Sequence, residues 1–137
     1  MSTSAPFTRE FLEELESSLL YLDDCDVECD GMTYAISYLL GKAGIAHARK
    51  IGHVECPQTF QVVHPHCWIE LDADTVIDFR LRMWLGDEDR IPHGVFRVSE
   101  HDIRYTGQIQ DRPIPTPAVL ALMTNNKLKE VTLQPPG

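Results

Sequence analysis

Long apolar runs are absent from this sequence, and none approaches the roughly 20 residues that a membrane-spanning helix needs. Clustered lysine and arginine are lacking too. The formal net charge of −9 disfavours nucleic acid as a partner, because phosphates call for clustered basic residues. Residues 1–6 contain neither the basic nor the apolar segment of a secretory signal peptide. We therefore expect a cytoplasmic protein that binds neither a membrane nor nucleic acid.

A metal-binding cysteine pattern is also missing. Four cysteines are present, but nothing else suggests secretion, so we expect reduced thiols. A zinc site is the alternative use of Cys25 and Cys29 together with His64, His66 and Cys67. That spacing matches neither a zinc ribbon nor a zinc finger, so we predict no metal and no cofactor.

Hydrophobic periodicity predicts helices in the first third of the chain and strands in the middle. The predicted helices cover Arg9–Leu22, Cys29 to a stop at Gly44, and Ala118–Met123; the predicted strands cover Ala46–Val54, Phe60–Leu71 and Thr75–Phe79. After Trp84 the sequence is less regular. With 137 residues and no internal repeat, the chain is predicted to form one α+β domain over residues 1–137, with helices packed on an antiparallel sheet.

The second predicted helix begins with a cysteine. Cys29 lies three residues before Met32 and seven before Ile36, so it starts the apolar stripe of that helix. A thiol at a helix N-terminus lies where the helix dipole stabilises a thiolate. The alternative is a small core cysteine, which the helix alone favours. The presence of His66 and Asp78 downstream makes a catalytic Cys29 the favoured interpretation instead.

Strand alternation tests whether His66 and Asp78 can meet. His66 and Trp68 share one face of the predicted strand, while Cys67 points to the other face and is predicted to be structural, behind the sheet. If residues 72–74 form the loop to the next strand, Asp78 pairs with Trp68. Asp78 is then a diagonal neighbour of His66 on the same face. A loop one residue shorter or longer would place Asp78 on the opposite face.

A cysteine, a histidine and an aspartate in this order are the components of a thiol nucleophile. The imidazole takes the thiol proton and later protonates the leaving group, and the carboxylate fixes the imidazole tautomer. The backbone N–H of Cys29 can donate to an oxyanion. His64 shares strand parity with His66, but Pro65 interrupts the strand between them, and Trp68 favours His66. We therefore predict Cys29, His66 and Asp78 as catalytic residues.

Three segments carry a resemblance to a known family. They are the helix that opens at Cys29 and ends in Leu39-Leu40-Gly41-Lys42-Ala43-Gly44-Ile45, the triplet His66-Cys67-Trp68, and Val76-Ile77-Asp78 at a strand end. In order and spacing they resemble the transglutaminase-like superfamily, whose core is papain-like. The resemblance covers residues 25–84, and residues 108–137 are expected to be a C-terminal extension of the same domain.

The resemblance implies a cysteine-dependent hydrolase or acyltransferase that acts on an amide or acyl group through a thioester. Hydrolysis, deamidation and transamidation share that intermediate. The expected partner is a peptide, a protein or a small amide. The alternative is a catalytically inert transglutaminase-like module used for partner binding.

Candidate substrate-binding residues are Trp68, Arg80 and Tyr21, the last being the nearest polar aromatic residue before Cys29. Nine of the 21 acidic residues lie between Glu10 and Asp30, which predicts a preference for cationic substrates. The alternatives are that these carboxylates form a solvated face, or that the arginines from Arg80 onwards cancel their field.

Overall fold

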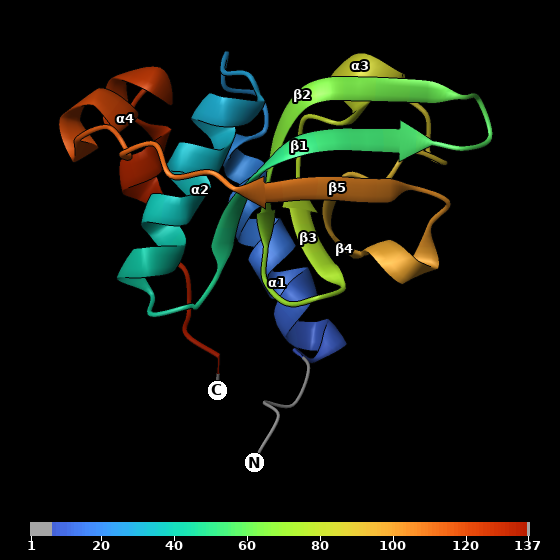
Figure 1. The fold of residues 1–137 in the computed structure, drawn as a ribbon. Coiled ribbons are helices and arrows are strands. Elements are labelled where there is room, and N and C mark those ends of the chain that lie inside the picture. Colours follow the sequence, from blue (N-terminus) through green and yellow to red (C-terminus); the bar gives the residue numbers. More distant parts are fainter. Residues whose placement is uncertain (1–6, 137) are drawn as a thin grey trace.

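A computed structural model describes residues 7–136 and consists of helices packed on a five-stranded antiparallel sheet (Figure 1). The strand order is β4-β3-β2-β1-β5. This confirms the α+β class. Residues 1–6, for which the sequence predicts no signal peptide, lie outside the described part. Among the described residues, no helix has both the length and the apolar character to cross a membrane.

The first two predicted helices are confirmed. Helix α1 covers Arg9–Leu19 and continues as the 3₁₀ turn η1, Leu20–Leu22, with the Thr8 side chain accepting a hydrogen bond from the Phe11 N–H. Helix α2 covers Cys29–Lys42. Gly44 follows with a φ of 71°, the left-handed conformation that commonly ends a helix.

The three predicted strands are also present, with shifted ends. They are β1, Ala48–Cys56; β2, Gln61–Glu70; and β3, Thr75–Asp78. Strand β2 pairs with β3 through Ile69–Ile77 and Glu70–Val76, which is the predicted register. The ladder stops at Ile69–Ile77, so His66 and Asp78 lie beyond its end, where β2 and β3 separate.

The less regular half of the sequence contains elements that were not predicted. They are α3, Arg82–Leu85; β4, Gly94–Arg97; η2, Val98–Glu100; β5, Arg104–Ile109; and η3, Lys127–Glu130. The predicted last helix is α4, Pro117–Met123. Strands β4 and β5 are short edge strands of mixed polarity, and such strands gain their stability from neighbours rather than from their own sequence.

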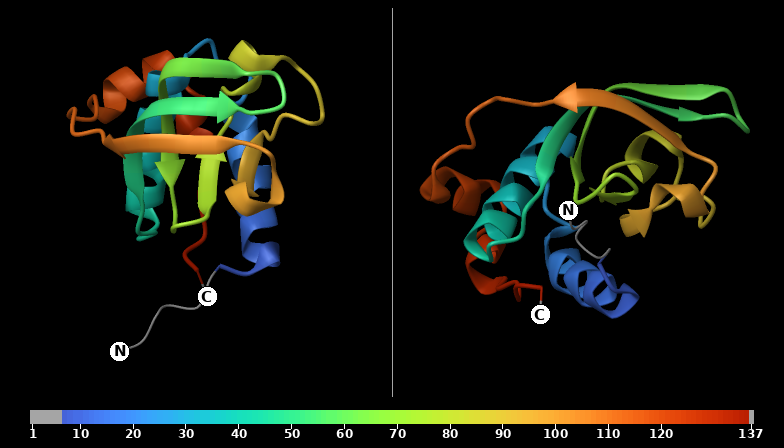
Figure 2. Two further views of the ribbon diagram at one scale, coloured as in Figure 1. Left: turned by 45° about the vertical axis from the view of Figure 1, so that its right-hand side comes forward. Right: turned by 60° about the horizontal axis from the view of Figure 1, so that its bottom comes forward.

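The sheet separates two hydrophobic cores, one on each of its faces. Helices α1 and α2 cover one face, and α4 lies against α2 (Figures 1 and 2). Ile69 and Ile77 point into this helix-side core. Trp68 and Val76 point to the other face, into a second core with Phe96. Alternation along β2 and β3 therefore sends neighbouring residues into different environments.

The sheet is strongly curved, and two glycines allow a close approach inside it. Gly52 of β1 faces Gly107 of β5. A Cβ atom on Gly107 would lie 2.6 Å from the Ile51 carbonyl oxygen and 2.7 Å from the Trp68 ring. Because no side chain intervenes, the indole lies against β5 and contacts Tyr105, with ring centroids 4.8 Å apart.

Candidate active site

Cys29 is the first residue of α2 and is half-buried. The N-cap residue, Glu28, makes no side-chain capping hydrogen bond, and the Asp30 carboxylate accepts only from the Gly31 N–H, at 2.7 Å. The positive end of the helix dipole is therefore directed at the Cys29 thiol. This placement favours the thiolate.

His66 and Asp78 form a buried pair. Nε2 of His66 donates to Oδ2 of Asp78 over 2.7 Å, and the two side chains are 0% and 1% exposed. Nδ1 of His66 is buried and has no hydrogen-bond partner among residues 7–136. His64, the rival on the same strand, is exposed, and its ring lies beside that of His53 instead.

The start of α2, with Cys29, lies near the His66–Asp78 pair at the end of the β2–β3 ladder. Because the strands separate beyond Ile69 and Ile77, Cys29 can lie next to Cys67 on the helix side and also next to His66. Cys29, Cys67 and Asp78 line one small cavity of about 10 Å³, room for about one water molecule. With Nε2 held by Asp78, Nδ1 is the imidazole nitrogen that remains for Cys29.

Cys29 and His66 shift each other's pKa in directions that favour a charged pair. A hydrogen bond from the Cys67 thiol, together with the neighbouring His66, lowers the pKa of Cys29 to about 5, although burial opposes the shift. Burial also disfavours protonated His66, but the Asp78 carboxylate and the adjacent Cys29 outweigh it and raise the pKa of His66 to about 10. At neutral pH the pair is therefore a thiolate and an imidazolium.

Asp78 is itself held from two sides. The Tyr105 hydroxyl donates to Oδ2 over 2.7 Å, and the Arg80 backbone N–H donates to Oδ1 over 2.9 Å. Burial, followed by the charge of Asp78, raises the pKa of Tyr105 well above its usual value, so the hydroxyl stays a donor. Sequence reasoning missed Tyr105 because β5 was not predicted and no local signal marks it.

Arg80 fastens the loop before Cys29 to β3. Its Nε donates to the Val27 carbonyl at 2.7 Å, and Nη2 donates to the carbonyls of Asp23 and Cys25 at 2.9 and 3.0 Å. Nη1 donates to Oδ1 of Asp23 and to the Phe79 carbonyl, both at 2.8 Å. All five N–H donors are occupied, which leaves none for the substrate carboxylate that the sequence suggested.

The other two predicted substrate-binding residues also lie away from the thiol. Trp68 is buried behind His66, with ring centroids 6.2 Å apart, so it supports the imidazole. Tyr21 is exposed, and its ring lies 5.0 Å from the Lys127 ammonium group. Neither residue lines the cavities beside Cys29.

The predicted position of Cys67 needs a correction. It does share the face of Ile69, as alternation requires, but that face is the one that α2 covers. Cys67 therefore faces Cys29 rather than lying behind the sheet, and the hydrogen bond to Cys29 raises the pKa of Cys67. Alternation fixes which residues share a face, but it cannot say which face a helix covers.

A cavity of about 660 Å³ opens at the thiol, within the size range of small-molecule sites. Its lining comes from the start of α2, from β1, β2 and α3, and from Arg112. The apolar side chains Val62 and Trp84 are 60% and 52% exposed and give its wall an apolar character. The charged lining residues are Glu28, Asp30 and Arg112.

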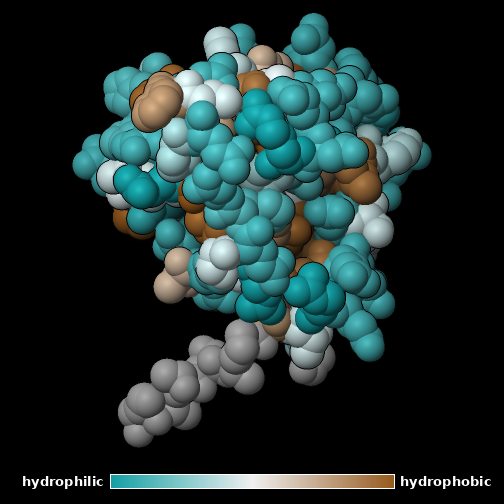
Figure 3. Space-filling view, turned by 90° about the vertical axis from the view of Figure 1, so that its right-hand side faces the viewer, coloured by the Kyte–Doolittle hydropathy of each residue, from teal (hydrophilic) through white to brown (hydrophobic). Residues whose placement is uncertain are grey.

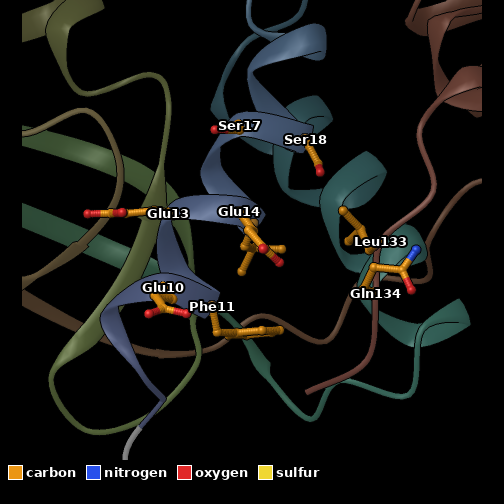
Figure 4. A pocket seen from close by; sticks show the side chains of 9 residues that line it. Glu10, Phe11, Glu13, Glu14, Ser17, Ser18, Leu133 and Gln134 are labelled. Carbon is orange, nitrogen blue, oxygen red and sulfur yellow. The ribbon is translucent and has the colours of Figure 1, made fainter. Parts of the chain in front are cut away.

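A second cavity, of about 440 Å³, lies between α1 and the segment containing Leu133 (Figure 4). Glu10, Glu13 and Glu14 of α1 are among its lining residues, but the lining holds neither a thiol nor an imidazole. The face of the molecule in Figure 3 is mostly hydrophilic, with its hydrophobic residues in separated patches. The cavity of about 660 Å³, by contrast, has the Cys29 thiol in its lining.

Within residues 7–136, no group of three or more His, Cys, Asp or Glu side chains is arranged to hold a metal ion. Comparisons with protein-family models, with curated proteins and with solved structures give no match for this chain. The function must therefore be argued from the site itself.

Proposed function

We propose that this chain is a thiol enzyme with a transglutaminase-like core, in which Cys29 attacks an amide or acyl group and forms a thioester. One observation carries the proposal. His66 is hydrogen-bonded through Nε2 to the buried Asp78, and its unpartnered Nδ1 remains for Cys29 at the start of α2. The opening of a cavity of about 660 Å³ at the thiol supports it, because a substrate needs access to the nucleophile.

In the proposed reaction, Cys29 and His66 both act in two stages, first in forming the thioester and then in cleaving it. The Cys29 thiolate attacks the carbonyl carbon, and the backbone N–H of Cys29 donates to the oxyanion that forms. The His66 imidazolium then gives its Nδ1 proton to the leaving amine as the tetrahedral intermediate collapses to the thioester. Neutral His66 next deprotonates water or an acceptor amine, which attacks the thioester and releases Cys29. Asp78 holds the imidazole throughout.

Charge around the cavity suggests the substrate class. Asp23 is bonded to Arg80 and His93, and Asp24 is bonded to Lys127, so these carboxylates contribute little to the field at the site. Glu28 and Asp30 remain at the cavity, opposed by Arg112. The balance is one negative charge, so we propose a modest preference for cationic substrates that salt weakens.

Acylation by p-nitrophenyl acetate tests the proposal without knowledge of the natural substrate. Wild-type protein is expected to release nitrophenol in a burst and to gain one acetyl group at Cys29, measured by peptide mass. Cys29→Ala should show neither effect, and His66→Ala should acylate ~10²-fold more slowly because the imidazolium that stabilises the Cys29 thiolate is lost. Matched cationic and anionic esters, at low and high salt, test the proposed charge preference.

An unreactive Cys29 would favour the alternative, an inert module that uses the same fold to bind a partner. Acylation at Cys25, Cys56 or Cys67 instead of Cys29 would contradict the proposed nucleophile. A folded Cys29→Ala variant, shown by circular dichroism, is needed for either conclusion.

A further inference from the structure

Cys67 is a buried thiol that the proposed acyl chemistry does not use. It follows His66 on β2 and is 6% exposed. Cys67 and Cys29 together line the small cavity of about 10 Å³, and both also line the cavity of about 660 Å³ that opens to solvent. Both thiols are free. Two free cysteines that line the same small cavity, at the wall of a larger accessible one, form a chemical site of their own.

We propose that Cys29 and Cys67 are an oxidative modification site, in which a hydroperoxide oxidises Cys29 and Cys67 closes an intramolecular disulfide. The proposal does not depend on the acyl chemistry, because it needs only a nucleophilic thiol, a path to solvent and a second thiol in the same small cavity. The remaining cysteines lack this arrangement. Cys25 donates to the Thr124 carbonyl at 3.4 Å, and Cys56 lies 3.7 Å from the Arg90 guanidinium.

The first step consumes one hydroperoxide. The Cys29 thiolate attacks the hydroxyl oxygen of the peroxide, so an S–O bond forms and the O–O bond breaks. The sulfur is oxidised by two electrons and becomes a sulfenic acid, and the peroxide is reduced to an alkoxide. The alkoxide takes the proton that His66 carries on Nδ1 and leaves as the alcohol. The buried Nδ1 of His66 has no other hydrogen-bond partner among residues 7–136, so its proton is available to the alkoxide.

The second step uses Cys67. While Cys29 is a thiolate, its hydrogen bond and its charge hold the Cys67 thiol protonated. A sulfenic acid carries no charge, so oxidation of Cys29 removes this restraint and frees Cys67 to ionise. Cys67 then attacks the Cys29 sulfur, an S–S bond forms and the S–O bond breaks. The hydroxide that leaves combines with the Cys67 proton as water, which balances the reaction.

Mass mapping of oxidised protein tests the proposal. The reduced full chain is treated with hydrogen peroxide at neutral pH, alkylated and digested without reductant. We expect a cross-linked peptide pair joining Cys29 to Cys67, loss of both thiols, and their recovery with dithiothreitol. Cys56→Ser should behave like wild type. Cys67→Ser keeps a hydroxyl beside Cys29 but cannot close the disulfide, so it should accumulate a sulfenic acid that dimedone traps.

Two results would overturn the proposal. One is a wild-type protein in which Cys29 proceeds to sulfinic or sulfonic acid, or stays reduced, with no Cys29–Cys67 peptide. The other is a disulfide that joins Cys29 to Cys25, to Cys56 or to a second chain. Both are measured on wild-type protein, so the test remains decisive even if Cys67→Ser fails to fold. Acylation of reduced Cys29 is measured separately and distinguishes this outcome from failure of the proposed enzyme.

Discussion

Cys67 is the residue whose hydrogen bond contributes most to the low pKa of Cys29. Cys67→Ala removes the donor, so the pKa of Cys29 should rise from about 5 towards the usual thiol value. Cys67→Ser retains a donor and should shift it less. The pH dependence of alkylation by iodoacetamide measures the change, because only the thiolate reacts. An unchanged midpoint in Cys67→Ala would show that His66 and the helix dipole suffice.

Tyr105 is a positioning residue in this site, because it touches Asp78 and not the thiol. Tyr105→Phe removes one buried hydrogen bond, and we expect a loss of about 1 kcal/mol in the free energy of unfolding. Asp78 keeps its bonds to His66 and to the Arg80 N–H, so acylation of Cys29 should slow by less than tenfold.

Asp78→Asn is the contrasting variant for Tyr105→Phe. It removes the charge that holds His66 protonated, so acylation should fall by ~10²-fold or more. A loss of acylation in Tyr105→Phe as large as that in Asp78→Asn would contradict the positioning role given to Tyr105.

The loop from Asp23 to Val27 is an element held in place largely by one guanidinium group. Arg80→Lys keeps the charge but loses the planar set of donors, so the free energy of unfolding should fall by about 1–3 kcal/mol. Urea denaturation measures this change. Arg9→Lys is the matched control, because Arg9 forms only an exposed ion pair with Glu100 and should leave the midpoint unchanged.

The same variant separates two roles for Arg80. If the loop positions Cys29, acylation should slow in Arg80→Lys even under conditions where the protein is fully folded. A midpoint shift no larger than that of Arg9→Lys would contradict the structural account of Arg80.

The contact between β1 and β5 depends on glycine. Gly107→Ala would force a Cβ to within 2.7 Å of Trp68, so we expect lower thermal stability and altered tryptophan fluorescence. Gly41→Ala is the control, since its Cβ meets nothing within 4 Å and α2 should gain up to about 1 kcal/mol. Equal melting temperatures for the two variants would mean that β5 moves freely away from β1.

At the scale of the whole molecule, the sequence predicted those helices and strands whose own residues show a clear local pattern. Hydrophobic periodicity indicates α1, Gly44 marks the end of α2, and alternation from His66 gives the register with β3. These features depend on neighbours a few residues apart along the chain. The predictions are most accurate where the chemistry of one short segment determines its conformation.

The parts that were not predicted depend on contacts between distant segments. Tyr105 reaches Asp78 only because the sheet curves, since β5 and β3 are separated in the sheet by β1 and β2. Cys67 meets Cys29 only because α2 covers that face. Arg80 is occupied by carbonyl groups of a loop more than 50 residues earlier in the chain. Residue type and local periodicity contain no information on such contacts.

The central claim is that Cys29 is a reactive thiolate paired with the His66 imidazolium, and the pH dependence of Cys29 acylation by p-nitrophenyl acetate tests it most directly. The folded-state pKa of Cys29, about 5, lies below the usual value of 9.0, so the thiolate is lost only as the pH falls through about 5. The account predicts a half-maximal rate near that pH and a plateau through neutrality, with the midpoint moved upwards in His66→Ala. A wild-type rate that keeps rising to the pKa of an ordinary thiol, and that matches His66→Ala at every pH, would contradict it.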